Sequence, residues 1–470
     1  MIVVPLGYVW WGSRVPSTYN VMDMGYVDVG GGSPVPMTGG TPVSDLTGPA
    51  TGAPAVTVTL VARRQSFRLA SGEQVDGYTL NGRSPGPVIR ATQGDLVQIT
   101  LVNRDVGDGV TLHWHGIDVP NAEDGVAGVT QDAVRQGGRH VYRFVVPDAG
   151  TYWYHSHQVS HEQVKGGLFG TFVVQPRDAA PAHELVAPVH TYDGRRTLAG
   201  RTGDRRLVTA PGQNARIRLV NTNDGPLVTW VAGSSYRVLA VDGHDVNAPS
   251  EIRGKAVVIP AGGRADLEIT APTDGRAARV DVGSAAVLVG PAGARRAETP
   301  VPDGRVDLLH YGSPTALPFD PAHPDRRFEY RIGRRIGFEN GLPGFWWSIN
   351  GHLWPDVPMH VIREGDIVTM SISNTSGDVH PMHLHGHHAV VLSRNGVKAT
   401  GSPWWVDTLE VDSGDTYVIA FAADNPGIWM DHCHNLKHAT QGLVAHLAYA
   451  GVTEPFTVGA GRQDVHNHPE

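Results

Sequence analysis

The chain of 470 residues contains a single cysteine, Cys433, with His432, His434 and His438 close beside it. A lone thiol has no partner for a disulfide, and zinc sites built on cysteine need several of them. A blue-copper site instead needs one thiolate, two imidazoles and a weak or absent axial ligand. Cys433 and His438 supply two of these ligands, and Leu443 lies where an axial methionine could have been. The pattern therefore favours copper, with a second imidazole from elsewhere in the chain.

His432 and His434 flank the cysteine, and on an extended chain both point to the face opposite the thiol. They must therefore serve a different metal site. Three further clusters contain the pattern His-x-His, so four such pairs together supply eight imidazoles. One pair alone is a common coincidence, whereas four are not. The other clusters are His113-Trp114-His115, His155-Ser156-His157 and the stretch from His380 to His387.

These four clusters are similar to the copper signatures of the multicopper oxidases, the family of laccases, bilirubin oxidases and bacterial copper oxidases. The resemblance spans about Val56 to Val452, with two motifs early and two late. It implies four coppers per chain: one of type 1, one of type 2 and a type 3 pair. It assigns His380, Cys433 and His438 to type 1, His113 and His383 to type 2, and His115, His155, His157, His385, His432 and His434 to type 3.

The resemblance also implies carboxylates near the oxygen-reducing cluster. Asp124, nine residues after His115, matches one of them, and we expect it to relay protons. Several bacterial relatives have a glutamate directly after the last type 1 histidine, where this chain has Ala439. The sequence therefore does not identify the proton-relay residue on that side of the cluster.

Composition predicts an all-β fold. The chain has 58 glycines and 34 prolines, and from Ala55 onward short alternating runs are separated by turn residues. The run ARIRLVN echoes DLVQITLVN before it and DIVTMSISN after it, which indicates an internal repeat. We expect three consecutive cupredoxin-like Greek-key β-sandwich domains, the middle one without a copper site. The expected boundaries are a tail or linker at 1–54, domains at 55–177, 178–318 and 319–455, and a C-terminal tail at 456–470.

Charge and the N-terminus bear on partners and location. With a net charge of −8, the chain lacks the excess of basic residues that is typical of nucleic-acid-binding proteins. The apolar run from Met1 to Trp11 is too short to span a bilayer and lacks the features of an export signal. Its Tyr8, Trp10 and Trp11 resemble the interfacial end of a membrane helix, so a membrane anchor and a packed tail both stay open. The resemblance implies an extracytoplasmic protein.

Three functions fit these residues. The first is a laccase-like oxidase that takes electrons from phenols or aromatic amines and reduces dioxygen. The second is a metallo-oxidase of Cu(I), Mn(II) or Fe(II), although eight methionines in the whole chain argue against a Met-rich cuprous route. The third is a copper electron-transfer or storage protein, which would need only the type 1 ligands. Domains one and three must meet to build the cluster, so one chain suffices and a monomer is expected.

Two further histidine pairs and one tryptophan pair are less specific signals of a functional site. His387-His388 alternates faces and His466-x-His468 lies in a terminal tail, so both pairs are interpreted as surface residues. Trp404-Trp405 resembles a loop near the type 1 site in the family, and substrate contact and core packing are equally good interpretations.

Overall fold

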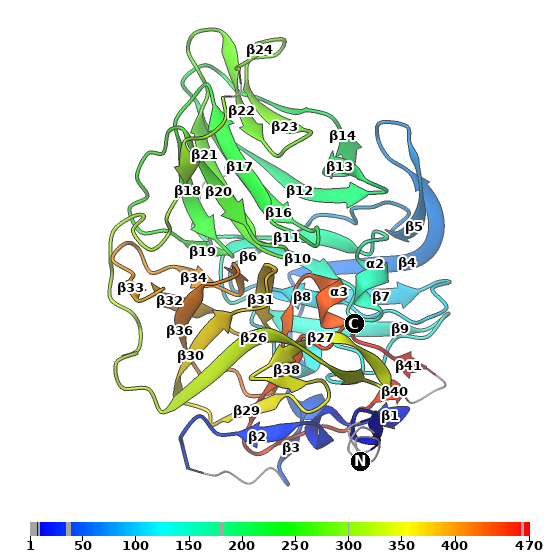
Figure 1. Cartoon of the computed structure of the whole chain (residues 1–470). Helices are drawn as coiled ribbons and strands as arrows, with labels where there is room; N and C mark the ends of the chain where they lie inside the picture. Colours follow the sequence, from blue (N-terminus) through cyan, green and yellow to red (C-terminus); the bar gives the residue numbers. More distant parts are fainter. Residues whose placement is uncertain (1–6, 8–9, 34–38, 179–182, 299, 462–464) are drawn as a thin grey trace.

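The computed structural model describes residues 7, 10–33, 39–178, 183–298, 300–461 and 465–470. Strands dominate it, and they form three β-sandwiches that follow one another along the chain (Figure 1). The expected all-β fold of three cupredoxin-like sandwiches is confirmed.

The first sandwich packs two four-stranded sheets face to face around Leu101, Trp114 and other fully buried apolar residues. Along β7 (Leu96–Asn103) the side chains alternate between half-buried and buried, because one face meets the other sheet. One sheet runs β5 (Gln74–Leu80), β4 (Val56–Arg68), β7 (Leu96–Asn103), β9 (Arg139–Val145), and the other runs β6 (Ile89–Thr92), β11 (Phe169–Gln175), β10 (Gly150–His155), β8 (His113–His115).

The second sandwich has its own apolar core, which includes Leu219, Val238 and Leu267. One sheet runs β14 (Arg201–Thr202), β13 (Arg195–Leu198), β12 (Glu184–Tyr192), β16 (Asn214–Asn221), β21 (Arg264–Thr270), β18 (Tyr236–Val241), β19 (His244–Asp245). The other runs β15 (Arg205–Val208), β23 (Ala286–Gly290), β22 (Arg276–Asp281), β17 (Leu227–Ala232), β20 (Lys255–Ile259), β25 (Gly304–Arg305), with β24 (Arg295–Arg296) on β22.

The third sandwich contributes the strands that carry the last two histidine clusters. One sheet runs β2 (Tyr26–Asp28), β29 (Pro358–Ile362), β38 (Val444–Tyr449), β37 (Ile428–Cys433), β31 (His380–Leu384), β35 (Thr408–Val411). The other runs β28 (His352–Leu353), β27 (Leu342–Ile349), β26 (Arg326–Glu339), β30 (Ile367–Asn374), β36 (Thr416–Ala422), β32 (Ala389–Arg394), β33 (Val397–Lys398), with β34 (Trp405–Val406) on β32.

The repeated sequence runs occupy the same place in each sandwich. β7 pairs in parallel with β4 and antiparallel with β9. β16 does the same with β12 and β21, and β30 with β26 and β36. The three runs are therefore the same central strand of one repeated fold.

The terminal segments join these sheets. β2 adds to the edge of the third sandwich beside β29, and β3 (Thr41–Pro42) pairs with β39 (Val452–Thr453). β1 (Thr18–Tyr19), β40 (Val458–Ala460) and β41 (His466–Asn467) form a small sheet of their own. The short helices are η1 (Val21–Asp23), η2 (Val43–Asp45), η3 (Asn121–Glu123), α2 (Ser160–Gln163) and α3 (Leu436–Ala439).

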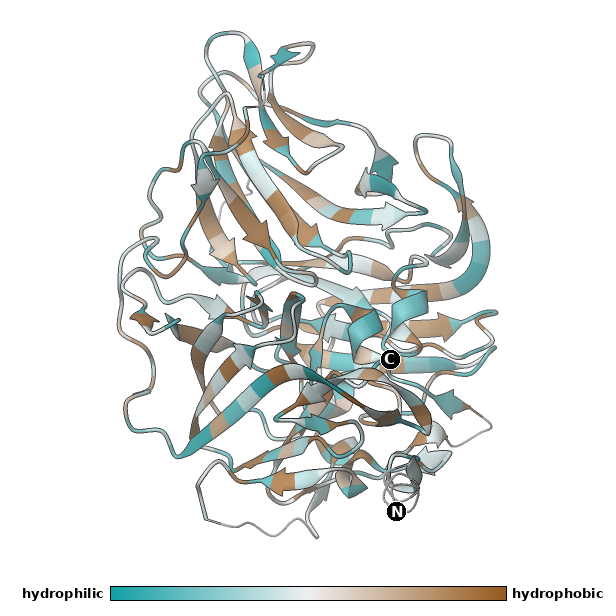
Figure 2. Cartoon of the chain, in the orientation of Figure 1, coloured by the Kyte–Doolittle hydropathy of each residue, from teal (hydrophilic) through white to brown (hydrophobic). Residues whose placement is uncertain are grey.

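Apolar and polar residues share the same strands, with brown bands frequent inside the sandwiches and teal stretches on β4, β5 and β26 (Figure 2). Among the described residues no helix has the length and apolar character needed to cross a bilayer. Most of the run from Met1 to Trp11, where an anchor was considered, lies outside the described residues. The first and third sandwiches lie side by side, with β8 and β31 near the middle of the molecule (Figure 1).

Candidate copper centres

The thiol of Cys433 meets two imidazoles inside the third sandwich. Cys433 ends β37, His380 begins β31 and His438 lies on α3. The Cys433 Sγ lies 3.6 Å from His380 Nδ1 and 3.8 Å from His438 Nδ1, and the two Nδ1 atoms are 3.2 Å apart. One sulfur and two nitrogens thus face a common point, as a trigonal copper site requires.

The outer nitrogens of the two imidazoles also have partners. The His380 Nε2 lies 2.7 Å from the Ser376 hydroxyl, and the His438 Nε2 lies 3.2 Å from the Asn435 amide. Such contacts fix ring orientation in metal sites. Burial lowers the pKa of His380 to about 3 and that of His438 to about 4, so both rings are neutral and free to bind a metal.

The Cys433 thiol is fully buried, and burial raises its pKa above the ordinary value. A thiolate at this place therefore needs a bound cation to offset the loss of hydration. The donor set of one sulfur and two neutral imidazoles fits copper better than zinc or a hard cation.

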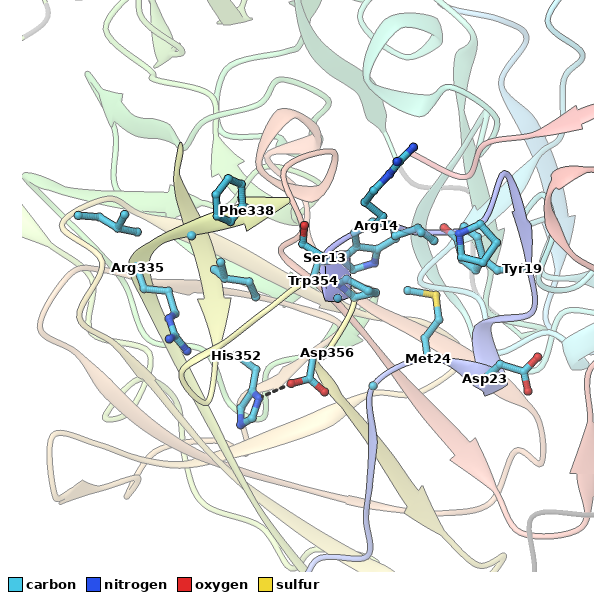
Figure 3. A pocket seen from close by; sticks show the side chains of 18 of the residues that line it. Ser13, Arg14, Tyr19, Asp23, Met24, Arg335, Phe338, His352, Trp354 and Asp356 are labelled. Carbon is cyan, nitrogen blue, oxygen red and sulfur yellow. Dashed lines mark hydrogen bonds and ion pairs between the residues drawn. The ribbon is translucent and has the colours of Figure 1, made fainter. Parts of the chain in front are cut away.

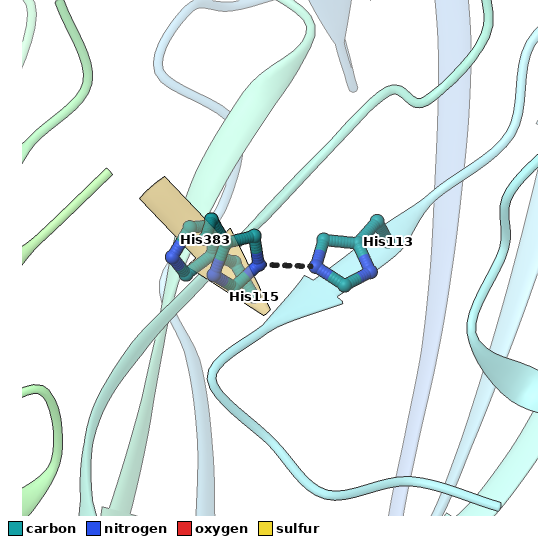
Figure 4. Close-up of side chains that lie close together, drawn as sticks. All are labelled: His113, His115 and His383. Carbon is teal, nitrogen blue, oxygen red and sulfur yellow. Dashed lines mark hydrogen bonds between the residues drawn. The ribbon is translucent and has the colours of Figure 1, made fainter. Parts of the chain in front are cut away.

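Eight imidazoles form a second cluster between the first and third sandwiches. They lie on or just beyond β8, β10, β31 and β37, and each is at most 2% exposed. Figure 4 shows three of them, with the Nε2 atoms of His113 and His383 3.4 Å apart. Their ring nitrogens gather in overlapping groups that could each hold an ion: His113, His115 and His383; His115, His155 and His434; His157, His385 and His432.

Several ring nitrogens in this cluster have no hydrogen-bond partner. These are the Nδ1 of His115, the Nε2 of His155, the Nδ1 of His432, and both nitrogens of His157 and of His434. Burial is the main cause that lowers the pKa of His155 to about 3 and that of His157 well below its ordinary value. Buried neutral imidazoles with unpaired nitrogens are costly unless something coordinates them. The cluster therefore fits a group of metal ions, and its donors suit copper.

Asp124, the expected proton relay, lies against two of the imidazoles. Its Oδ1 is 3.0 Å from His113 Nδ1, and its Oδ2 is 3.0 Å from His385 Nδ1. A carboxylate on the outer nitrogen of a ligating histidine sets the tautomer and orientation of the ring. The contact supports a positioning role for Asp124 beside the expected proton role.

Sequence reasoning did not predict that Asp407 lies against the imidazole cluster. Asp407 lies 3.1 Å from His115 Nε2, its backbone carbonyl is 2.9 Å from His383 Nδ1, and it accepts two hydrogen bonds from Arg264 of β21. Burial alone would raise the pKa of Asp407, but the Arg264 guanidinium and His115 hold it well below its usual range. The second sandwich thus fixes an anion beside the cluster.

Gly262 of the second sandwich closes one side of the cluster. A Cβ atom at this position would lie 2.9 Å from atoms of both His115 and His434, and the residue has φ +86°. Both the close approach and the backbone conformation require glycine. The middle sandwich, expected to lack a copper site, therefore still shapes one.

The surface interpretation of His387-His388 is wrong. His387 is buried, with its Nε2 2.6 Å from the Tyr449 hydroxyl, and His388 lies between Asp118 and Asp407 at 3.3 and 3.2 Å. The His387 ring packs within the third sandwich, and the His388 ring contacts residues of all three sandwiches, so neither side chain is at the surface. His466 and His468 are exposed as expected.

The tryptophan beside the thiol site is not one of the pair singled out in the sequence. Trp404 packs against the core of the third sandwich and Trp405 stacks against His244. Trp347 of β27 lies instead against His438 and His380, with ring centroids 4.5 and 4.7 Å apart. Arg334 lies 3.9 Å above the Trp347 ring.

A cavity of about 590 Å³ lies elsewhere, between the N-terminal segment, the end of β26 and the segment 352–356 that begins with β28. Figure 3 shows Tyr19, Met24, His352 and Trp354 among its lining residues. None of the candidate copper ligands lines it. The metal centres are recognised by their donor atoms and not by cavity size.

Comparison with known proteins agrees with this geometry. Two family models, both described as "Multicopper oxidase", match residues 62–179 and 329–451. The chain is 30% identical to the multicopper oxidase MmcO of Mycobacterium tuberculosis over 84% of this chain and 87% of that one, and 27% identical to Laccase-1 of Botryotinia fuckeliana over 83% and 81%. A crystal structure of a multi-copper oxidase from Pseudomonas thermotolerans matches with TM-score 0.69 and 27% identity, over 85% of this chain and all of that one.

The eight-imidazole cluster is called the imidazole cage below. Three cupredoxin-like sandwiches, a single thiol site and this cage define a copper-binding oxidoreductase. The chain belongs to the multicopper oxidase family.

Proposed function

We propose that the protein is a laccase-like oxidase. It takes single electrons from phenols or aromatic amines at a type 1 copper held by His380, Cys433 and His438. It uses four of these electrons to reduce dioxygen to water at a cluster of three further coppers. Copper supplies one-electron chemistry there, because thiolate and imidazole ligands stabilise both Cu(I) and Cu(II).

The cluster ligands follow from the groups of ring nitrogens described above. His113 and His383 would hold the type 2 copper. The type 3 pair would be held by His115, His155 and His434 on one ion and by His157, His385 and His432 on the other. This gives four coppers per chain, all held by residues of one chain, so a monomer is sufficient.

The observation that carries the proposal is the position of Cys433 between His432 and His434. Its thiol faces His380 and His438, while its two neighbours face the imidazole cage. The two centres are thus joined by the covalent bonds of adjacent residues. An electron carrier or copper store would need the first centre only, so the eight-imidazole cage argues against that class.

The charges around His438 favour an organic reductant over a metal cation. His438 is only partly buried, and it lies against Trp347, which is stacked under Arg334. The nearby carboxylate of Asp378 is 3.6 Å from Arg334, so its charge is partly offset. The Trp347 ring is buried under Arg334 and presents no stacking surface to a substrate. A metal cation approaching His438 would meet the positive charges of Arg334 and exposed Lys437, whereas a neutral phenol or amine would not be repelled. A metallo-oxidase of Cu(I), Mn(II) or Fe(II) is the second candidate.

Oxygen uptake by the copper-loaded protein tests the proposal, with a phenol, an aromatic diamine, Cu(I) and Mn(II) offered separately. We expect uptake with the phenol and the diamine and little with either metal ion. Uptake with the metal ions alone would establish the metallo-oxidase instead. No oxygen uptake with any of these four reductants would favour an electron-transfer or copper-storage protein.

Leu443→Met tests the geometry of the type 1 site. Leu443 is fully buried, and its carbonyl accepts a hydrogen bond of 3.1 Å from the Cys433 backbone N–H. A thioether on the copper axis stabilises Cu(II), so the type 1 potential should fall; roughly 60 mV corresponds to a tenfold change in a one-electron equilibrium. Rates on poorly reducing phenols should fall most, with copper content unchanged.

The matched control is Leu267→Met, a swap of similar volume in the core of the second sandwich. It should leave the potential unchanged in a redox titration. An unchanged or raised potential in Leu443→Met would mean that this side chain does not lie on the copper axis.

The extracytoplasmic location, the domain boundaries and the N-terminal anchor stay predictions. Fractionation of cells that make the protein, with detection of membrane and soluble pools, tests location and anchor together.

A further inference from the structure

The C-terminal segment 465–470 reaches the imidazole cage, although the sequence suggested only a tail. Glu470 lies with its Oε1 3.2 Å from the Nδ1 of His432, which is fully buried. The two atoms lie within ion-pair distance but do not form a hydrogen bond with each other or with another group. The segment thus brings a carboxylate to a histidine that we propose as a type 3 ligand.

The other ring nitrogen of His432 faces the cage. Its Nε2 lies 3.2 Å from the Nε2 of His385, and both rings belong with His157 to one group of donor atoms. The Nδ1 of His385 faces outward to Asp124 at 3.0 Å. His432 and His385 therefore share one arrangement, with Nε2 toward the metal position and Nδ1 toward a carboxylate.

Several hydrogen bonds fix the position of Glu470 and of the residues before it. The Ser160 hydroxyl donates to Glu470 Oε2 at 3.0 Å, at the start of α2 and three residues after His157. The Val159 backbone N–H donates to the His468 carbonyl at 2.6 Å, and the His468 N–H donates to Gln158 Oε1 at 2.9 Å. The segment is thus fastened to the loop that carries the second histidine motif.

Asn467 anchors the segment to the first sandwich as well. It is fully buried, accepts from the Ala133 N–H at 2.9 Å, and donates to Asp132 at 2.7 Å. The position of Glu470 is therefore set by a network that spans the first sandwich and the C-terminal segment.

The Glu470 side chain borders a cavity of about 250 Å³. Pro469, Met430, Ala439 and His446 are among the other residues that line it. Ala439 follows His438 directly, and its small side chain leaves the space open.

We infer that Glu470 is a positioning residue for the type 3 copper site: its carboxylate holds the His432 ring so that Nε2 faces the metal. The inference rests on the proposed assignment of His432 as a copper ligand. A carboxylate on the outer nitrogen fixes the tautomer of a ligating histidine, and loss of such a partner costs typically 10- to 100-fold in metal affinity or activity.

The test compares Glu470→Ala with Glu470→Gln, because the amide of glutamine keeps an oxygen that can accept from Nδ1–H. Copper content, the near-ultraviolet and electron paramagnetic resonance signals of the type 3 pair, and the visible type 1 band are measured on each. Glu470→Ala should bind the type 3 copper roughly 10- to 100-fold more weakly and lose the spectrum of the coupled pair. Its type 1 band should stay, and Glu470→Gln should resemble the wild type.

His466→Ala is the matched control, since it removes an exposed side chain of the same segment and should change nothing. If Glu470→Ala does not fold, Ser160→Ala tests the same contact by removing the donor to Oε2, and a partial loss of the type 3 signal is expected. Wild-type copper affinity and type 3 spectrum in the folded variants, or equal damage in Glu470→Gln and Glu470→Ala, would overturn the inference. Wild-type protein without a type 3 pair would overturn the proposed function itself.

Discussion

Replacing Cys433 by serine is expected to abolish the intense visible band of the copper-loaded protein and its oxygen consumption, while copper stays in the imidazole cage. The band arises from charge transfer between thiolate and Cu(II), and Cys433 is the only cysteine of the chain. A serine hydroxyl is a hard donor that binds copper poorly beside two imidazoles. The type 2 resonance signal should persist, because all eight imidazoles are unchanged.

Visible absorption, resonance spectra and copper content of the two proteins check this expectation. Thermal unfolding of the copper-free forms is the control, since serine differs from cysteine by one atom and should leave the fold intact. A fully loaded, oxidised wild-type protein without colour would contradict the type 1 assignment.

Removal of one imidazole from either side of the cage is expected to stop oxygen reduction. His115→Ala changes the first sandwich and His434→Ala the third, yet both rings belong to the same group of donor atoms. Each variant should still take up electrons at the type 1 copper, so an aromatic reductant should bleach the visible band without oxygen being consumed. The loss should be of similar size in both, because a shared site fails whichever ligand is missing.

His323→Ala is the matched control, since this side chain is 86% exposed and its Nδ1 contacts the exposed Asp320 carboxylate. It should turn over oxygen as the wild type does. Oxygen reduction at the wild-type rate in either cage variant would exclude that residue from the cluster and favour the electron-carrier function.

The candidate ligands could be predicted because their spacing carries the information. Strand geometry places residues i and i+2 on one face, so each His-x-His pair indicates two imidazoles that point the same way. Cys433 with its two neighbours adds the link between the centres. The structure brings together all eleven side chains that the resemblance assigned, and their binding of copper stays a proposal.

The residues around the ligands could not be predicted in the same way. Asp407 and His115 are 292 residues apart, and Arg264 reaches Asp407 from another sandwich. Glu470 lies in a segment without a strand pattern, which takes its order from the loop after His157. Such contacts depend on how the sandwiches pack against one another, and local sequence periodicity does not predict that packing.

The fold, too, could be predicted from the sequence only in part. Alternation was visible in β7 and β30, where one face meets the core and the other is half exposed. It is absent from β10, whose residues are all buried because both of its faces are covered. The pairing of β2 and β3 was also hidden, since Gly- and Pro-rich segments acquire strand structure from the edge that they join.

The cage between the sandwiches also constrains how the protein matures. His113 and His383, whose ring nitrogens nearly touch, are 270 residues apart in the chain. Domains tend to fold in the order of their synthesis, so the first four imidazoles are in place before the last four have been made. The complete cage that we propose as a copper site exists only once both outer sandwiches have formed and docked. Protein made without copper should need a slow, temperature-dependent activation, because the ions must enter an interior that has already closed.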